Sequence, residues 1–385
     1  MSFLALMVFM ICPIMVLPFV FIGLKKDKRH RKIYLAIIAF LLALFSYSYQ
    51  PTSIEDLYRH QSDAMQYQYS EIDTLIDDIH NEPEQLAIAY KFMIGKTGNP
   101  SLLQFFTSAV SFFILLYLLN AYTEKNEKLR GWKLVGVWLF VLSGFYYIVI
   151  TSNIFYTLAL EIFSLGVYMD YARNRKIVGW VFYILPVFIH TCAILPLALI
   201  VLYKLLRSRI NTKNVVLLVI LILSIHILLS VVAANINLPI ITEISNLYRW
   251  YFNNEGSWSN LHTPSVLLLY MSKLVPVVLA YKVSKMKDPV SDFALFMAIA
   301  IVILFFQTTF SIRYIHVAVL CGLPVLFRAA QDKKYGQIFC VLLYAFAIPH
   351  FIYQVRQMVS RTDWGSFENV QRIFVTNLIT TLTKG

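Results

Sequence analysis

The sequence predicts an all-α protein, a polytopic transmembrane helical bundle of about 12 spans. Hydrophobic residues make up 59% of the chain and charged residues only 14%, and the mean hydropathy is +0.66. This composition excludes a soluble globular chain. Apolar runs long enough to cross a bilayer recur along the sequence, and short basic clusters separate many of them. We therefore predict that residues 1–385 form a single integral-membrane domain.

The distribution of positive charge predicts the orientation of the spans. The formal net charge is +12, and most of the 33 lysines and arginines fall into six clusters. The clusters lie at residues 25–32, 125–133, 173–176, 204–213, 282–287 and 328–334. All six fall on one side if the spans alternate, and cytoplasmic loops are the ones enriched in Lys and Arg. The charge thus indicates topology in the cytoplasmic membrane, and it gives no reason to expect nucleic acid as a partner.

The expected spans follow from the apolar runs taken in order. They lie near residues 3–24, 33–49, 102–122, 133–150, 154–172, 178–190, 191–206, 215–233, 265–283, 291–310, 312–328 and 335–353. The first run has neither a basic leader nor a small-residue cleavage site, so we interpret it as a mature helix. Four stretches are then extracytoplasmic: the loop 50–100, a turn near Thr151, the loop 234–264 and the tail 354–385.

The loop 50–100 is a long polar stretch between two spans. It carries nine carboxylates and three cations. The cations are Arg59, Lys91 and Lys96. Its middle has apolar residues at helical spacing, as Leu75, Ile76 and Ile79 show. Because connections between helices are usually far shorter, we expect a helical cap over the extracytoplasmic membrane face rather than a plain connector.

The stretch 178–206 departs from regular spans. Basic clusters flank it on the same side, so it must cross twice, and two full crossings need roughly 40 residues at about 1.5 Å per residue. Pro186 and Pro196 interrupt it. We expect short tilted helices or a re-entrant pair with His190 and Thr191 near the tip. Broken backbone at membrane depth requires surrounding protein or a water-filled cavity, which predicts a cavity near His190.

Charged residues within or near the spans are the first candidates for chemistry. Glu161 and Lys273 fall at similar depth inside their spans, and they form either a structural charge pair or part of a functional site. Four arginines near the outer boundary oppose the positive-inside rule, namely Arg59, Arg249, Arg313 and Arg356. His316 follows Arg313 by one helical turn on the same face. Guanidinium groups bind phosphate oxygens bidentately, so this set suits an anionic headgroup, while anchoring at the lipid interface is the simpler alternative.

Metal and nucleotide chemistry have no sequence support. The chain lacks a DxD pair in a suitable setting, a Walker loop and a glycine-rich nucleotide fingerprint. Its four cysteines all fall inside apolar runs and have no metal-ligand spacing. We expect no metal and no cofactor.

Four short motifs occur in a recognisable order. They are Asp63 followed four residues later by Tyr67, the run TSNIFYTLALEIF at 151–163 with Asn153 near its start, the run FIHTCA at 188–193 with His190 at its centre, and Arg313-Tyr314 at the start of a span. In order and topology they resemble the EpsG-like branch of the Wzy-type polysaccharide polymerases. The chain departs from that pattern in two places. Tyr156 stands where the family has an arginine, and Ala64 stands where a tyrosine commonly follows the loop aspartate.

The resemblance implies glycosyl transfer at the outer face of the cytoplasmic membrane. Polyprenyl-diphosphate-linked oligosaccharide repeat units would be joined into O-antigen, capsule or exopolysaccharide. Asp63 is the first candidate for the acceptor base, with His60 and His190 as alternatives. The candidates for binding the leaving diphosphate are Arg313, Arg249 and Arg59, with His316 beside the first. Candidates for contacts with sugars are Tyr67, Tyr69, Trp250, Trp258 and Asn153.

Other functions remain open at this point. A flippase or other transporter of the same lipid-linked units would also use many spans and broken helices, and a polysaccharide ligase would use the same kind of donor. The expected partners are the lipid-linked oligosaccharide as donor and acceptor, the lipid bilayer, and possible protein partners in a chain-length regulator and a flippase.

Overall fold

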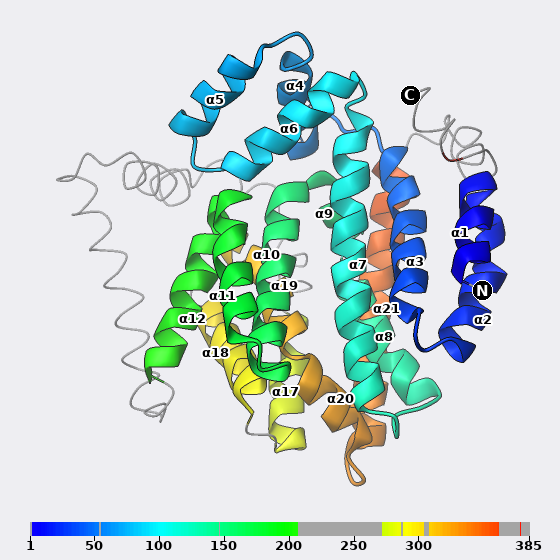
Figure 1. The fold of residues 1–385 in the computed structure, drawn as a ribbon. Coiled ribbons are helices and arrows are strands. Elements are labelled where there is room, and N and C mark those ends of the chain that lie inside the picture. The colour runs from blue at the N-terminus through cyan, green and yellow to red at the C-terminus, as the bar shows by residue number, and fades with distance from the viewer. Residues whose placement is uncertain are drawn as a thin grey trace. The chain divides into compact units, whose positions relative to one another are not determined.

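The computed structural model describes residues 2–53, 55–145, 147–206, 272–285, 288–303, 308–361 and 378. Within these ranges the chain forms 17 α-helices and four short 3₁₀ or π turns, with no β-strand. The predicted all-α class is therefore confirmed for the described part of the chain (Figure 1). The loop 234–264 and most of the tail 354–385 lie outside the described residues.

The chain divides into two compact units, Met1–Ala193 with Ala347–Gly385, and Ile194–Phe346. The elements up to Ala193 are α1 (Ser2–Ile11), η1 (Pro13–Val16), α2 (Leu17–Lys26), α3 (Arg31–Tyr47), α4 (Asp56–Gln66), α5 (Ile72–Asn81), α6 (Gln85–Thr97), α7 (Ser101–Lys125), α8 (Trp132–Gly144), α9 (Tyr147–Ser152), α10 (Ile154–Val167), η2 (Tyr168–Ala172), α11 (Lys176–Ile184), η3 (Leu185–Phe188) and η4 (Thr191–Ala193). The later elements are α12 (Ile194–Leu206), α17 (Leu274–Ser284), α18 (Pro289–Ile303), α19 (Thr308–Cys321), α20 (Leu323–Gln331) and α21 (Gly336–Arg361). The single integral-membrane domain stays a prediction.

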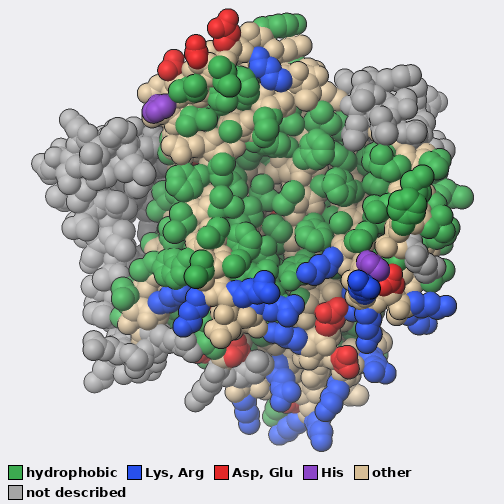
Figure 2. Space-filling view, in the orientation of Figure 1, with side chains coloured by type: hydrophobic (Ala, Val, Ile, Leu, Met, Phe, Trp, Pro, Cys, Tyr) green, Lys and Arg blue, Asp and Glu red, His purple; other side chains and the backbone are tan. Residues whose placement is uncertain are grey.

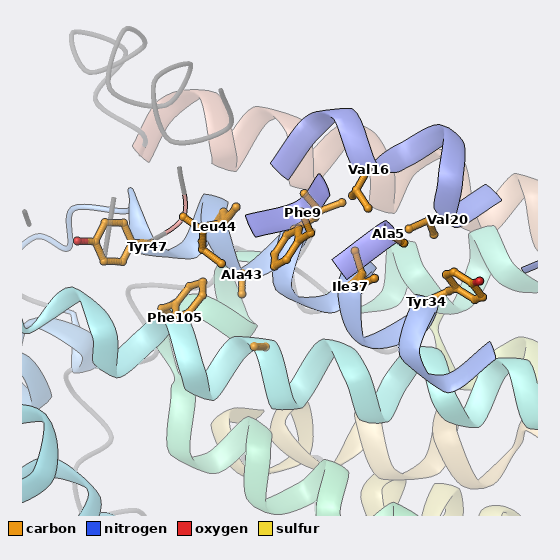
Figure 3. Packing of buried hydrophobic residues seen from close by; sticks show 13 residues of the cluster. Ala5, Phe9, Val16, Val20, Tyr34, Ile37, Ala43, Leu44, Tyr47 and Phe105 are labelled. Atoms are coloured by element: carbon orange, nitrogen blue, oxygen red, sulfur yellow. The ribbon is translucent and has the colours of Figure 1, made fainter. Parts of the chain in front are cut away.

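The first predicted span, 3–24, is broken into two helices. Proline has no backbone N–H, and Pro13 directly after Cys12 ends α1 and starts the turn η1 that leads into α2. α2 packs tightly on α3, because a Cβ at Gly23 would lie 2.2 Å from the Tyr34 ring. Side chains of α1, α2, α3 and α7 form one buried apolar core (Figure 3). Its labelled members are Ala5, Phe9, Val16, Val20, Tyr34, Ile37, Ala43, Leu44, Tyr47 and Phe105.

The loop 50–100 folds into the three helices α4, α5 and α6, so the expected helical cap is present. α4 and α6 lie at one end of α7 (Figure 1) and contact both each other and α7, while α5 packs on α6. The Tyr90 hydroxyl donates to the Leu103 carbonyl at 2.9 Å, and the Asn99 amide donates to the Tyr47 hydroxyl at 2.9 Å. The cap is thereby fixed to the start of α7 and the end of α3.

α7 joins the cap to a basic end of the first unit. Its 25 residues give a length of about 37 Å at ~1.5 Å per residue. At its far end Arg31 of α3 pairs with Glu124 at 2.7 Å, and Lys125 donates to the Ala172 carbonyl at 3.3 Å. Three of the six basic clusters therefore meet at the end of α7 opposite to the cap. Figure 2 shows a broad hydrophobic surface below the acidic outer surface of the cap. Within this unit, the predicted separation of acidic cap and basic clusters is observed.

The helical pair predicted at 178–206 consists of two short apolar helices, 176–188 and 191–206. Pro186 lies in the 3₁₀ turn η3, and its carbonyl accepts the backbone N–H of Ile189 at 3.0 Å and of His190 at 2.9 Å. The chain breaks at these two residues before η4 begins. Whether the pair is re-entrant stays a prediction.

The second unit contains a sharp bend that the sequence reading placed inside one span. The predicted span 312–328 is a pair of helices, α19 and α20, which meet at an angle of 51°. A Cβ at Gly322 would lie 2.8 Å from a methyl group of Val277 in α17, so α17 packs against the bend. After α20, the Tyr335 and Lys334 amides hold the pKa of Asp332 below its usual range, and Lys285 and Arg328 lower it further. Two basic clusters thus meet in this unit.

The described residues support fewer full-length spans than predicted. By length and composition, α7 and α21 could cross a membrane, and the bent pair α19 and α20 counts as a third candidate. Several other predicted spans are shorter apolar helices of 10–17 residues. The apolar helices indicate a membrane protein, while the count of about 12 spans stays a prediction.

Candidate functional site

The cap meets α10 in a cluster that we call the cap junction. It consists of His60 and Asp63 from α4, Glu84 before α6, Tyr90 and Lys91 from α6, Phe155 and Tyr156 from α10, and His190 and Thr191 at the helix break. The Phe155 ring lies at its centre. His60 and Tyr90 approach this ring edge-on at centroid distances of 4.8 and 6.2 Å, and the Lys91 ammonium lies 5.8 Å from its centroid. Three cap side chains thus converge on one residue of α10.

Helical periodicity explains why His60 and Asp63 of α4 face α6 and α10. Leu57 and Ala64 are fully buried, and they are seven residues apart on one face of α4. His60 falls between them, three residues after the first and four before the second. Asp63 lies one helical turn beyond His60, at the edge of the same face. The apolar anchors therefore carry an imidazole and a carboxylate into contact with α6 and α10.

Asp63 and Lys91 form the ion pair of the cap junction. The Lys91 ammonium donates to a carboxylate oxygen of Asp63 at 2.8 Å, and the two side chains are 14% and 38% exposed. The pair joins α4 to α6 across 28 residues of sequence. Asp63 was predicted to act as the acceptor base in a run where arginine, histidine and tyrosine side chains could converge, and this role stays a prediction. Its ion-pair partner is Lys91, which the sequence did not place in the site.

His60 is held in its neutral form. Burial is the main cause that lowers the pKa of His60 to about 2, and the charges of Lys91, Arg59 and His190 lower it further. Its Nδ1 atom is buried and has no hydrogen-bond partner among the described residues. A neutral imidazole can accept a hydrogen bond through its unprotonated nitrogen, but such a low pKa makes it a weak proton acceptor. This favours Asp63 over His60 as the base.

His190 is oriented by its own turn and by the cap. Its Nδ1 atom accepts the backbone N–H of Cys192 at 3.1 Å, and a carboxylate oxygen of Glu84 lies 3.4 Å from the same nitrogen. The same oxygen accepts the backbone N–H of Thr191 at 3.0 Å and its hydroxyl at 3.2 Å. The His190 ring stands edge-on to Tyr156 at 6.4 Å. The helix break is therefore connected to both the cap and α10.

The other predicted residues of the cap do not enter the cap junction. The Tyr67 hydroxyl donates to Asp78 at 2.5 Å, and burial together with Asp78 raises the pKa of Tyr67. Tyr69 is 89% exposed. Arg59 is exposed and pairs with Asp56 at 3.1 Å, although its charge still acts on His60.

A profile of the EpsG family matches residues 58–366, from the first turn of α4 to beyond α21. The chain belongs to the EpsG family. Comparisons with curated proteins and with solved structures give no match. Membership in the EpsG family indicates a role in polysaccharide biosynthesis, and the matched range contains every residue of the cap junction.

Two further predicted residues of this EpsG protein lie on or before α10. Asn153 immediately precedes the helix, and its carbonyl accepts the Thr157 backbone N–H at 3.2 Å. Glu161 lies about two turns further along α10 and is fully buried. Neither of its carboxylate oxygens has a hydrogen-bond partner among the described residues. Burial of a carboxyl group in this way is costly, so Glu161 stays a candidate for function.

The remaining predicted residues belong to the second unit or lie outside the described residues. Lys273 and His316 are buried in the second unit, close enough to interact electrostatically. Arg313 lies in α19, one turn before His316. The predicted pair of Glu161 with Lys273 joins residues of different units, and it stays a prediction. Arg249, Trp250 and Trp258 lie outside the described residues.

Sequence reasoning missed three functional candidates of this EpsG protein, namely Lys91, Glu84 and Phe155. One signal for Lys91 was present, because it is one of only three cations in an otherwise acidic loop. Glu84 resembled the eight other carboxylates of that loop, and Phe155 resembled any apolar residue of a span. Their positions become informative only when the cap is folded onto α10.

Proposed function

We propose that this EpsG protein polymerises polyprenyl-diphosphate-linked oligosaccharide repeat units at the outer face of the cytoplasmic membrane. The observation that carries the proposal is the Lys91–Asp63 pair, which packs with His60 on Phe155 under a helical cap. It places a cation, a carboxylate and an aromatic ring together. Glycosyl transfer from a diphosphate needs these groups for leaving-group stabilisation, proton acceptance and contact with sugar.

The location of the cap junction supports an outward-facing site. Three basic clusters of the first unit lie at the opposite end of α7, and cytoplasmic loops are the ones enriched in such residues. The cap is therefore on the extracytoplasmic side. Lipid-linked repeat units on that side lie in the outer leaflet, with their diphosphate at the membrane surface.

The reaction transfers a glycosyl group between two lipid-linked chains. A hydroxyl oxygen of the acceptor sugar forms a bond to the anomeric carbon of the donor, the bond from that carbon to the diphosphate oxygen breaks, and polyprenyl diphosphate leaves. Negative charge builds up on the diphosphate during this step, so a cation beside it stabilises the transition state more than the ground state. Lys91 supplies such a cation in the cap junction, and Arg59, Arg249 and Arg313 with His316 are further candidates.

The ion pair gives Asp63 a means of activation. In the free protein Lys91 holds one of its carboxylate oxygens at 2.8 Å. A bound diphosphate competes for the Lys91 ammonium, and Asp63 is then released to accept the proton of the acceptor hydroxyl. Binding of the donor would thereby prepare the base. Tyr67, Tyr69, Trp250, Trp258 and Asn153 remain candidates for contacts with the sugars.

Reconstitution with a lipid-linked repeat unit tests the proposal. The purified protein in lipid vesicles should convert single units into a ladder of longer products. Asp63→Asn keeps the shape of the side chain and removes its basicity, so it should stop extension while the donor still binds. Asp77→Asn, on the exposed face of α5, should leave the ladder nearly intact.

The outcomes distinguish the classes of function. Movement of the unit across the bilayer without elongation would indicate a flippase, and transfer of a finished chain to another acceptor would indicate a ligase. Either result, or an active Asp63→Asn variant beside an inactive Asp77→Asn variant, would reject the proposed site.

A further inference from the structure

Glu84 makes long-range contacts that have no role in the reaction proposed above. It precedes α6, immediately after Pro83, and its side chain reaches the break between η3 and η4. One carboxylate oxygen accepts both the backbone N–H and the hydroxyl of Thr191, at 3.0 and 3.2 Å. The residues are 107 positions apart. A single carboxylate thus joins the cap to the interrupted helix pair.

The contacts resemble those of a helix N-cap supplied by a distant segment. The first N–H groups of a helical turn have no partner within the turn, and a side-chain oxygen usually accepts one of them. At this break the His190 side chain accepts the Cys192 N–H, and Glu84 of the cap accepts the Thr191 N–H. Hydrogen bonds to a carboxylate are stronger than those between neutral groups. The position of the turn at Thr191 therefore depends on Glu84.

The same turn determines how His190 is presented. Because Nδ1 of His190 accepts the Cys192 N–H at 3.1 Å, the neutral imidazole carries its proton on Nε2. The ring stands edge-on to Tyr156, and it lies close to His60 of α4. A shift of the turn would move the imidazole away from these neighbours.

We propose that Glu84 is a positioning residue, which ties the cap to the helix break and fixes the orientation of His190 in the cap junction. We call the contact between Glu84 and Thr191 the tie. The tie does not depend on the reaction, whereas its importance for catalysis rests on the proposed function. Glu84 acts through Thr191 and His190, and it has no role in proton transfer. An uncharged side chain that keeps the acceptor oxygen should therefore retain most of the effect.

Cys192 is a native reporter for the tie. It is partly exposed and lies directly after Thr191, and its backbone N–H bonds to His190. The purified wild-type protein is treated with a maleimide, and peptide mapping by mass spectrometry gives the labelling rate at Cys192 alone. Glu84→Ala should raise this rate by about 10- to 100-fold, the range expected from losing hydrogen bonds to a charged group. Glu84→Gln should stay within a few-fold of wild type, and Thr191→Val, which keeps the backbone N–H, should be intermediate.

Glu71→Ala provides the matched control. Glu71 precedes α5 as Glu84 precedes α6, and neither side chain caps the helix that follows it, but Glu71 is exposed. Its labelling rate and polymer ladder should equal those of wild type. In the polymerisation assay, Glu84→Ala should lower kcat at unchanged protein level while Glu84→Gln restores it, whereas a contact that only holds the break would leave kcat unchanged in both variants.

The two assays separate the two proposals. If Glu84→Ala labels at the wild-type rate, or if Glu84→Gln labels as fast as Glu84→Ala, the tie is refuted whatever the activity. If labelling behaves as expected but wild-type protein produces no ladder, the tie stands and the proposed function fails. If the ladder forms and Glu84→Ala labels fast with unchanged kcat, Glu84 holds the break but does not position a group needed for the reaction.

Discussion

The Lys91–Asp63 pair gives the sharpest test of the cap junction, because its structural and functional contributions differ greatly in size. The N–O distance is 2.8 Å, and the side chains are 14% and 38% exposed. Since the aspartate is partly in water, we expect the pair to contribute only about 1 kcal/mol to the free energy of unfolding. If Lys91 stabilises the leaving diphosphate, its removal should reduce the rate about 10²- to 10³-fold. We predict this combination for Lys91→Met.

The chain contains a closely matched control for this change. Arg31 and Glu124 form a pair at 2.7 Å with side chains that are 17% and 46% exposed, at the opposite end of α7. Arg31→Met should therefore shift the thermal midpoint about as much as Lys91→Met, by a few degrees or less, without slowing polymerisation. The assays are thermal unfolding of the purified protein and the initial rate of ladder formation from a lipid-linked repeat unit.

Exchanging the two charged residues distinguishes a structural role of the Lys91–Asp63 pair from a catalytic one. In the Asp63→Lys/Lys91→Asp protein the ion pair can re-form, so most of the lost stability should return. Activity should not return, because the cation and the base have changed places relative to Phe155 and α10. If the exchanged protein regained wild-type activity, the pair would be a structural link between α4 and α6, and our assignment of the cap junction would be refuted.

Three further predictions concern topology, the second unit and pH. Single cysteines at Ser70 and Lys28 should differ in intact cells, since an impermeant thiol reagent should label the first and not the second; the reverse pattern would invert the topology. Arg313→Lys keeps the charge but loses the planar fork, so the polymer yield should fall substantially, and Arg313→Ala should be nearly inactive at normal protein levels; wild-type yield from the alanine variant would make Arg313 a lipid anchor. Because burial lowers the pKa of His60 from 6.5 to about 2, only the unfolded chain gains this proton as the pH falls below 6.5. Stability should then decrease by about 2 kcal/mol between pH 6.5 and 5, and thermal unfolding of His60→Gln should lack this part of the slope.

Local patterns predicted much of the fold because they depend on neighbouring residues. The spacing of Leu75, Ile76 and Ile79 predicted a helix, and α5 runs through all three. Pro186 and the shortage of residues at 178–206 predicted a broken pair, and the break occurs next to His190. By contrast, the bend between α19 and α20 was missed. Gly322 and Pro324 mark it, but they sit inside a run whose hydropathy is that of an ordinary span.

The contacts of the cap junction could not be predicted in the same way. Lys91 meets Asp63 across 28 residues, and Glu84 meets Thr191 across 107. These pairings depend on how three cap helices pack on α10, and each carboxylate of the loop is an equally good partner until that packing is known. The motif pair Asp63 and Tyr67 shows the same limit. The residues are one turn apart on or at the end of α4, yet the Tyr67 hydroxyl bonds to Asp78 of α5.

The missing arginine of the family pattern has a structural counterpart in Lys91. Tyr156 occupies the position where an arginine was expected, which leaves the start of α10 without a cation of its own. Lys91 reaches that place from α6, with its ammonium 5.8 Å from the ring of the preceding residue, Phe155. An ammonium can form this cation–π contact and the ion pair with Asp63 together, and both hold it at the cap end of α10. A positive charge is therefore present beside the first turn of α10, delivered by the cap instead of the span. Because the cap also carries Asp63, the cation and the proposed base belong to one folded element. A movement of the cap would therefore displace Lys91 and Asp63 together.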